Sequence, residues 1–135
     1  MCEPHRRNHI LVVEDDRDLR ESLIEALEAA GYSVAAAQDG RHALFYLRTS
    51  KRPDLILLDL QMPNMNGVEF RREQLKSAEL AAIPVAVLTA DPDGREKIAA
   101  LETAGFLRKP LSMPQLFELI ARVVSPRDLG GRSVT

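Results

Sequence analysis

Hydrophobic residues along the chain gather in five short runs, separated by longer segments of mixed character. The runs begin near positions 10, 34, 55, 85 and 106, so the intervals between them are 24, 21, 30 and 21 residues. Each interval has room for one helix and two loops. Because the runs do not alternate with polar residues, they are typical of strands that are covered on both faces. Regular succession of strand and helix predicts βαβ units and a parallel sheet.

The segments between the runs carry the spacing of amphipathic helices. In the first segment, Leu19, Leu23 and Leu27 form one apolar stripe, and Gly31 follows as a stop signal. Ser112 is a good N-cap, and Gln115 three residues later fits a capping box. We expect helices over residues 17–30, 41–48, 67–78, 92–104 and 112–125.

Five βα units fill residues 9–125 and leave no room there for a second domain. A chain of 135 residues is expected to form one domain, with a core that needs neither disulfides nor a structural metal. We expect a flexible segment at 1–8 and a tail at 126–135. The predicted fold is α/β: a single-domain, doubly wound (βα)5 parallel sheet of the flavodoxin-like kind, with strand order 2-1-3-4-5.

The composition argues against several classes of protein. Its 45% hydrophobic and 28% charged residues are ordinary for a globular domain. With a net charge of -2 there is no basic field for nucleic acid or for a membrane surface. Apolar runs fall far short of the ~18 residues of a membrane span, and the start has no apolar signal-peptide region. A single cysteine, Cys2, fits a reducing compartment, so we expect a cytoplasmic location.

Four of the five predicted strands end in reactive groups. Glu14-Asp15-Asp16 follows the first strand, Asp59 the third, Thr89 the fourth and Lys109-Pro110 the fifth. Parallel strands bring their carboxyl ends to one edge, where open α/β sheets bind ligands. The second strand, which is peripheral in the order 2-1-3-4-5, ends in the turn Gln38-Asp39-Gly40 outside that crevice. The four groups therefore predict a single site.

The carboxylates of this predicted site need a compensating cation. Three of them within a few ångströms repel by roughly 1–4 kcal/mol per pair, and they stay ionised only beside positive charge. Lys109 supplies one positive charge, and a hard divalent ion, Mg²⁺ or Mn²⁺, would supply the rest. Asp15 and Asp59 are the candidate direct ligands. Glu14 can reach the ion through a water, and the backbone carbonyl of Gln61 can add another oxygen.

Asp59 is the candidate nucleophile because it stands alone at the end of the central strand. An aspartate can carry a covalent phosphoryl group, and catalysis of phosphoryl transfer is mainly positioning and charge neutralisation. The metal, Lys109 and the Thr89 hydroxyl could each contact one phosphoryl oxygen. Asp91 is a candidate N-cap of the helix that follows, and both Asp91 and Gln61 could also influence attack by water on a phosphoaspartate.

Four motifs together resemble the receiver domain of two-component response regulators, of the CheY-like kind, over about residues 9–125. They are Ile10–Asp16, Leu57–Gly67, Leu88–Ala90 and Leu107–Pro110. One such motif is a weak signal, but all four in order, at strand ends, are specific. The resemblance implies that Asp59 is the phosphoacceptor.

By the same resemblance, Glu14 and Asp15 form the acidic pair that binds Mg²⁺, and Lys109 contacts the phosphoryl group, with a cis bond to Pro110.

The resemblance also implies a conformational switch. The Thr89 hydroxyl would move toward the phosphoryl group while the Phe106 ring turns inward, which alters a protein-binding surface around the fourth helix, fifth strand and fifth helix. Family members usually have a few residues between the glycine that ends the fourth helix and the switch aromatic. Here Gly105 directly precedes Phe106, so we expect a short loop. The run Arg71-Arg72-Glu73 is interpreted as a solvated helix face.

The partners implied by the resemblance are proteins. A sensor histidine kinase or a histidine phosphotransfer protein would donate the phosphoryl group, and a downstream protein would read the switch. We expect a monomer or a phosphorylation-dependent dimer that turns over no external substrate, either alone or as one receiver of a larger hybrid protein.

Two alternative functions stay open. One is a constitutive, receiver-like interaction module. The other is an aspartyl-phosphate phosphohydrolase. Gln61 argues against it, because such enzymes carry an acid/base aspartate at that position.

Overall fold

The structure is a computed structural model that describes residues 8–124. The expectations for residues 1–7, Cys2 among them, and for the tail at 126–135 concern residues outside this range. Five parallel strands form one sheet in the order β2-β1-β3-β4-β5, which confirms the predicted topology. The strands are β1 (His9–Val13), β2 (Ser33–Ala37), β3 (Leu55–Asp59), β4 (Val85–Thr89) and β5 (Gly105–Arg108).

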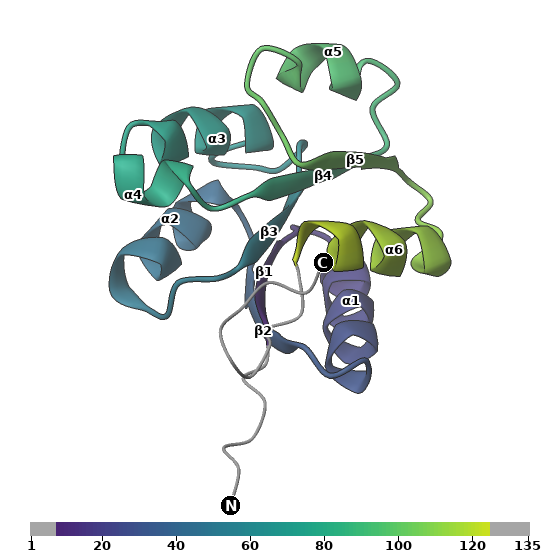
Figure 1. The fold of residues 1–135 in the computed structure, drawn as a ribbon. Helices are drawn as coiled ribbons and strands as arrows, with labels where there is room; N and C mark the ends of the chain where they lie inside the picture. Colours follow the sequence, from purple (N-terminus) through teal and green to yellow (C-terminus); the bar gives the residue numbers. More distant parts are fainter. Residues whose placement is uncertain (1–7, 125–135) are drawn as a thin grey trace, which may run out of the picture.

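Helices cover both faces of the sheet, as a doubly wound fold requires. In Figure 1, α1 and α6 lie together on one face, and α2, α3 and α4 lie on the other, while α5 stands above β4 and β5. The helices are α1 (Arg17–Ala29), α2 (Gly40–Thr49), α3 (Gly67–Leu75), α4 (Ala78–Ala81), α5 (Gly94–Ile98) and α6 (Met113–Val123).

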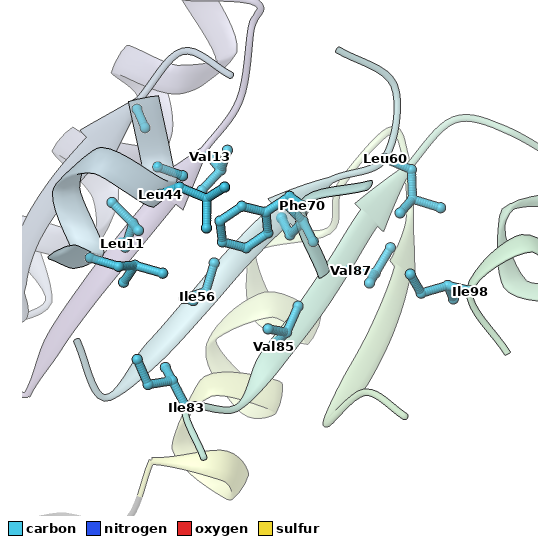
Figure 2. Packing of buried hydrophobic residues seen from close by; sticks show 14 residues of the cluster. Leu11, Val13, Leu44, Ile56, Leu60, Phe70, Ile83, Val85, Val87 and Ile98 are labelled. Carbon is cyan, nitrogen blue, oxygen red and sulfur yellow. The ribbon is translucent and has the colours of Figure 1, made fainter. Parts of the chain in front are cut away.

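Two hydrophobic layers explain why the strand sequences do not alternate with polar residues. Successive side chains of a strand point to opposite faces, and here both faces are buried. Phe70 of α3 lies at the centre of one layer, against Ile56 of β3 (Figure 2). The other layer packs Leu57 of β3 against α1 and α6, with Leu23 and Leu116 among its members. All residues of β1, β3 and β4 are buried as a result.

Strand register brings the carboxyl ends of the central strands level. Val13 of β1 pairs with Leu58 of β3, so Glu14 and Asp59 leave the sheet at the same height. Asp59 in turn pairs with Leu88 of β4, the residue before Thr89. This register builds the crevice that the strand-end pattern predicted.

Two of the predicted helix starts are confirmed. The Asp16 side chain accepts the amide of Leu19, and Ser112 accepts the amide of Gln115, so both residues cap their helices. Asp91 does not cap the next helix as proposed, because α5 begins at Gly94.

The predicted helix over 92–104 is wrong in its length. α5 covers Gly94–Ile98 alone, and residues 99–104 form an irregular connection. Ile98 is the one fully buried apolar side chain of α5, so little burial stabilises further turns. Gly105 consequently begins β5 instead of ending a helix, and the expected short loop before Phe106 is not found.

The helix predicted over 67–78 is divided at Ser77. Its hydroxyl accepts the amide of Leu80 and starts the separate short helix α4. Serine side chains that bond to nearby backbone compete with helix continuation in this way.

Arg71 corrects the interpretation of its neighbourhood as a solvated face. This side chain is 6% exposed. Its guanidinium donates to Oε1 of Gln74 at 2.7 Å and to the carbonyl oxygen of Glu102 at 2.8 Å. Gln74 donates in turn to the carbonyls of Leu80 and Ile83. Arg71 thereby ties α3 to the connection that leads into β5.

Candidate functional site

Three carboxylates converge at the carboxyl edge of the sheet. One oxygen from each of Glu14, Asp15 and Asp59 lies within 4.8 Å of the others. Glu14 and Asp59 are buried, with 1% and 4% of their surface exposed, while Asp15 is exposed at the rim. The sequence prediction that these side chains share one site is thus supported by their geometry.

Lys109 extends into this cluster from the end of β5. Its Nζ donates to Oε1 of Glu14 at 2.9 Å and lies 3.6 Å from Oδ2 of Asp59. Burial alone would lower the pKa of Lys109, but the hydrogen bond to Glu14 and the charge of Asp59 outweigh it, so the pKa is raised. The ammonium is therefore held in its charged form against both carboxylates. The Lys109-Pro110 bond is cis, as predicted.

The electrostatics of Asp59 are unusual for an aspartate. Burial, and then the negative charge of Glu14, raise its pKa from 3.8 to about 7, against the opposing pull of Lys109. One ammonium does not offset three carboxylates. A divalent cation placed here would favour the ionised form of Asp59.

Glu14 is held by contacts on both of its oxygens. Oε1 accepts from Lys109, and Oε2 accepts from the amide of Asp16 at 3.0 Å. Arg20 also donates to the Glu14 carbonyl at 2.8 Å, which fixes the backbone after β1. A carboxylate with both oxygens engaged suits the expected contact to a cation through water. Asp16, whose side chain caps α1, serves the helix start.

Gln61 and Asp91 meet beside Asp59. The backbone amide of Gln61 donates to Oδ1 of Asp59 at 3.3 Å, and the side-chain Nε2 of Gln61 donates to Oδ2 of Asp91 at 3.4 Å. Asp91 is buried and paired with Lys97 of α5, and the hydrogen bond from Lys97 lowers the pKa of Asp91. Sequence reasoning named Gln61 and Asp91 for one shared role, but it missed Lys97, which no spacing rule connects to them.

Thr89 is fully buried at the end of β4. Its Oγ1 accepts the amide of Asp91 at 3.0 Å, and its carbonyl accepts the amide of Lys109 at 2.9 Å. The hydroxyl is thus fixed one residue past the strand partner of Asp59. The contact of this hydroxyl to a phosphoryl group stays a prediction.

Phe106 is half-buried and packs against the core layer that contains Phe70. The Arg95 guanidinium carbon lies 4.5 Å from the centroid of its ring, within the range of a cation–π contact. Gly94 lies close to both predicted switch residues. A Cβ atom there would come within 2.6 Å of Cγ2 of Thr89 and 3.5 Å of Cζ of Phe106. Neither Arg95 nor Gly94 was found from the sequence, because their roles depend on how α5 packs.

The donor set fits a hard divalent ion. Carboxylate and carbonyl oxygens are the ligands that Mg²⁺ prefers, and Mg²⁺ commonly uses only one or two protein carboxylates. Asp15 and Asp59 could bind it directly, Glu14 through water, and Gln61 through its carbonyl.

In the described residues, no helix is long and apolar enough to cross a membrane.

Comparisons with known proteins identify the family of this chain. A model of the response regulator receiver domain matches residues 10–121. The response regulator MprA of Mycolicibacterium vanbaalenii is 40% identical over 129 residues, which are 92% of this chain and 54% of that protein. The chain therefore spans about half the length of the curated relatives it matches.

Solved structures show the same fold. A response regulator receiver protein from Pseudomonas putida is 33% identical, with a TM-score of 0.81 over 87% of this chain and 98% of that one. The response regulator TrrA of Thermotoga maritima, solved with Mg²⁺ and BeF, is 28% identical, with a TM-score of 0.77 over 86% of this chain and 98% of that one. From the family match, the strand order and the acidic crevice, the chain belongs to the response regulator receiver domain family.

Proposed function

We propose that Asp59 accepts a phosphoryl group from a phosphohistidine donor, in a reaction that requires Mg²⁺ or Mn²⁺. The observation that carries this proposal is the burial of Asp59 among the oxygens of Glu14 and Asp15, with the Lys109 ammonium 3.6 Å away. A carboxylate in this position can receive a dianionic group only where positive charge is already arranged around it.

The transfer exchanges one bond for another. An oxygen of Asp59 forms a bond to phosphorus, and the bond from phosphorus to the donor imidazole nitrogen breaks, leaving its electron pair on the ring. The imidazole departs as a neutral ring when its other nitrogen carries a proton. A bound Mg²⁺ would neutralise charge on the phosphoryl oxygens. Lys109, already held against Asp59, would contact another of these oxygens.

Phosphorylation is proposed to act through Thr89 and Phe106. A new dianion beside Thr89 attracts its hydroxyl, which would give up the amide of Asp91. Phe106 would then turn inward beside Gly94, where a Cβ atom would approach both side chains. This movement would change the surface formed by α5, β5 and α6.

Gln61 and Asp91 are proposed to tune the loss of the phosphoryl group. Their side chains meet 3.4 Å apart, and the Gln61 amide also donates to Asp59. A water that attacks phosphorus would therefore approach beside the side chains of Gln61 and Asp91. Substitution at either position should change the lifetime of the phosphoaspartate.

We infer that the partners are a sensor histidine kinase or a histidine phosphotransfer protein, and a downstream protein that reads the switch. The chain itself would turn over no external substrate, and it would be a monomer or a phosphorylation-dependent dimer. The capture of Mg²⁺ and BeF by TrrA supports the choice of cation. Since the curated relatives extend well beyond the matched region, the expectation of no nucleic acid contact stays a prediction.

The proposal is tested with acetyl phosphate and intact-mass measurement. In the presence of Mg²⁺, the wild-type chain should gain one phosphoryl group, and Asp59→Asn should gain none. Asp18→Asn, which removes an exposed carboxylate from α1, is the matched control and should behave as wild type. A chelator should abolish the gain.

Other outcomes would favour the alternatives. A wild-type chain that folds, binds Mg²⁺ and remains unmodified would favour a constitutive interaction module. Turnover of generic phosphomonoesters would favour a phosphohydrolase.

A further inference from the structure

Asp39, in the turn after the peripheral strand β2, makes more contacts than a helix cap requires. It is 1% exposed. Its Oδ1 accepts the amide of His42 at 2.9 Å and the ring Nδ1 of His42 at 2.8 Å, and the first of these bonds caps α2. Its Oδ2 accepts from Nδ2 of Asn64 at 2.8 Å. The second oxygen is thus directed at the loop between β3 and α3.

A second contact holds the next residue of that loop. The Gly40 amide donates to the carbonyl of Met65 at 3.2 Å. A Cβ atom at Gly40 would lie 2.9 Å from this carbonyl oxygen, so only glycine allows so close an approach. Asn64 itself has a φ of 67°, in the left-handed region that asparagine tolerates better than most residues. The turn after β2 therefore contacts two successive residues of the β3–α3 loop.

This loop carries a candidate metal ligand. It leaves the sheet at Asp59 and places the Gln61 amide 3.3 Å from Oδ1 of Asp59. The loop closes on itself where the Gly67 amide donates to the Leu60 carbonyl at 2.9 Å. Because the loop is closed between Leu60 and Gly67, we expect a shift at Asn64 to move Gln61 as well.

The bond between Asp39 and Asn64 is charge-assisted at neutral pH. Burial alone would raise the pKa of Asp39, but the hydrogen bonds from His42 and Asn64 lower it to about 2. Hydrogen bonds with an ionised partner are shorter and stronger than neutral ones. Asp39 is therefore an ionised acceptor at neutral pH.

We propose that Asp39 and Gly40 are positioning residues for the reaction: they hold the β3–α3 loop so that the Gln61 carbonyl faces the cation site. The inference rests on the proposed function, because it assigns these residues to the metal site of that reaction. It brings the peripheral strand, which the sequence placed outside the crevice, into the construction of the site.

Asn64→Gly is the sharpest test. Glycine accepts a positive φ, so the loop keeps its backbone conformation but loses the side-chain amide that donates to Asp39. In the metal-free protein, hydrogen exchange at the amides of Gln61 and Met62 should become faster. The dissociation constant for Mg²⁺, followed by calorimetric titration, should rise about tenfold, at the lower end of the effect of removing groups that orient metal ligands.

Two further variants separate positioning from helix capping. Asp39→Asn should also raise the dissociation constant for Mg²⁺, and combining it with Asn64→Gly should raise it no further. His42→Ala removes the ring contact but keeps the backbone cap and the Asn64 bond. It should therefore leave Mg²⁺ affinity and Gln61 exchange as in wild type.

The proposal is overturned if Asn64→Gly leaves both readouts at their wild-type values, since Asp39 would then be only a cap of α2. Failure of the proposed function would look different. In that case the wild-type chain would bind no Mg²⁺ or accept no phosphoryl group, while exchange in the metal-free protein would still report on whether Asp39 holds the loop.

Discussion

The raised pKa of Asp59 makes the stability of the metal-free protein depend on pH. A carboxyl whose pKa is higher in the folded than in the unfolded chain takes up a proton on folding. The free energy of unfolding therefore falls as the pH rises between the two values. For Asp59 these values are 3.8 and about 7. Since each tenfold change in proton affinity corresponds to about 1.4 kcal/mol, the ionised form costs up to about 4 kcal/mol.

Asp59→Asn isolates this contribution because asparagine has the same shape and does not ionise. We expect the variant to be more stable than wild type at pH 8, by up to about 4 kcal/mol. The advantage should shrink steadily as the pH falls toward 4, because wild-type Asp59 becomes protonated. Urea unfolding of both proteins without metal, from pH 4 to pH 8, measures the difference.

Two controls connect the effect to the site. Glu25→Gln removes an exposed carboxylate from the middle of α1, and its difference in stability from wild type should not vary with pH in this way. Mg²⁺ should stabilise wild type at pH 8 more than Asp59→Asn, because the cation offsets the charge that destabilises the fold. A difference between Asp59→Asn and wild type that is the same at pH 4 and pH 8 would refute the electrostatic argument.

Three further substitutions follow from the contacts of the site. Lys109→Met removes the ammonium 3.6 Å from Asp59, so the pKa of Asp59 should rise further above about 7 in a carbon-13 NMR titration; an unchanged pKa would contradict the pairing. Gly94→Ala places a methyl group 2.6 Å from Cγ2 of Thr89 and should lower the free energy of unfolding by about 1–3 kcal/mol; wild-type stability would show that the space is larger than described. Arg71→Met removes the buried donor of Gln74 and should lower the free energy of unfolding by about 1–3 kcal/mol. Amide exchange over residues 99–104 should become faster, because the bond to the Glu102 carbonyl is lost as well. Arg72→Met, at the exposed neighbour, is its control, and equal effects of the two would argue against a special role for Arg71.

The sequence was sufficient to predict the parts of the site that lie at strand ends. Strands buried on both faces leave a visible apolar run, and parallel pairing forces their carboxyl ends to one edge. Glu14, Asp59 and Lys109 follow from these two rules. The helix starts near residues 17 and 112 could also be predicted, because a cap bonds to an amide only three positions away; the caps are Asp16 and Ser112.

Contacts between distant segments were decided only by the tertiary structure. Asp39 contacts Asn64, 25 residues away, and Arg71 contacts Glu102, 31 residues away. Neither pair leaves a periodic signal, because a polar side chain on a turn or helix has the same local pattern whether it meets water or a distant carbonyl. The short length of α5 also depended on how little of it the core could bury.

The sequence by itself therefore determined which groups reach the crevice, since strand direction and order follow from local pattern and chain connectivity. The tertiary structure alone determined how firmly those groups are held, and how far the pKa of Asp59 rises. Burial, charge separation and loop anchoring depend on distances that are set when all the elements pack together.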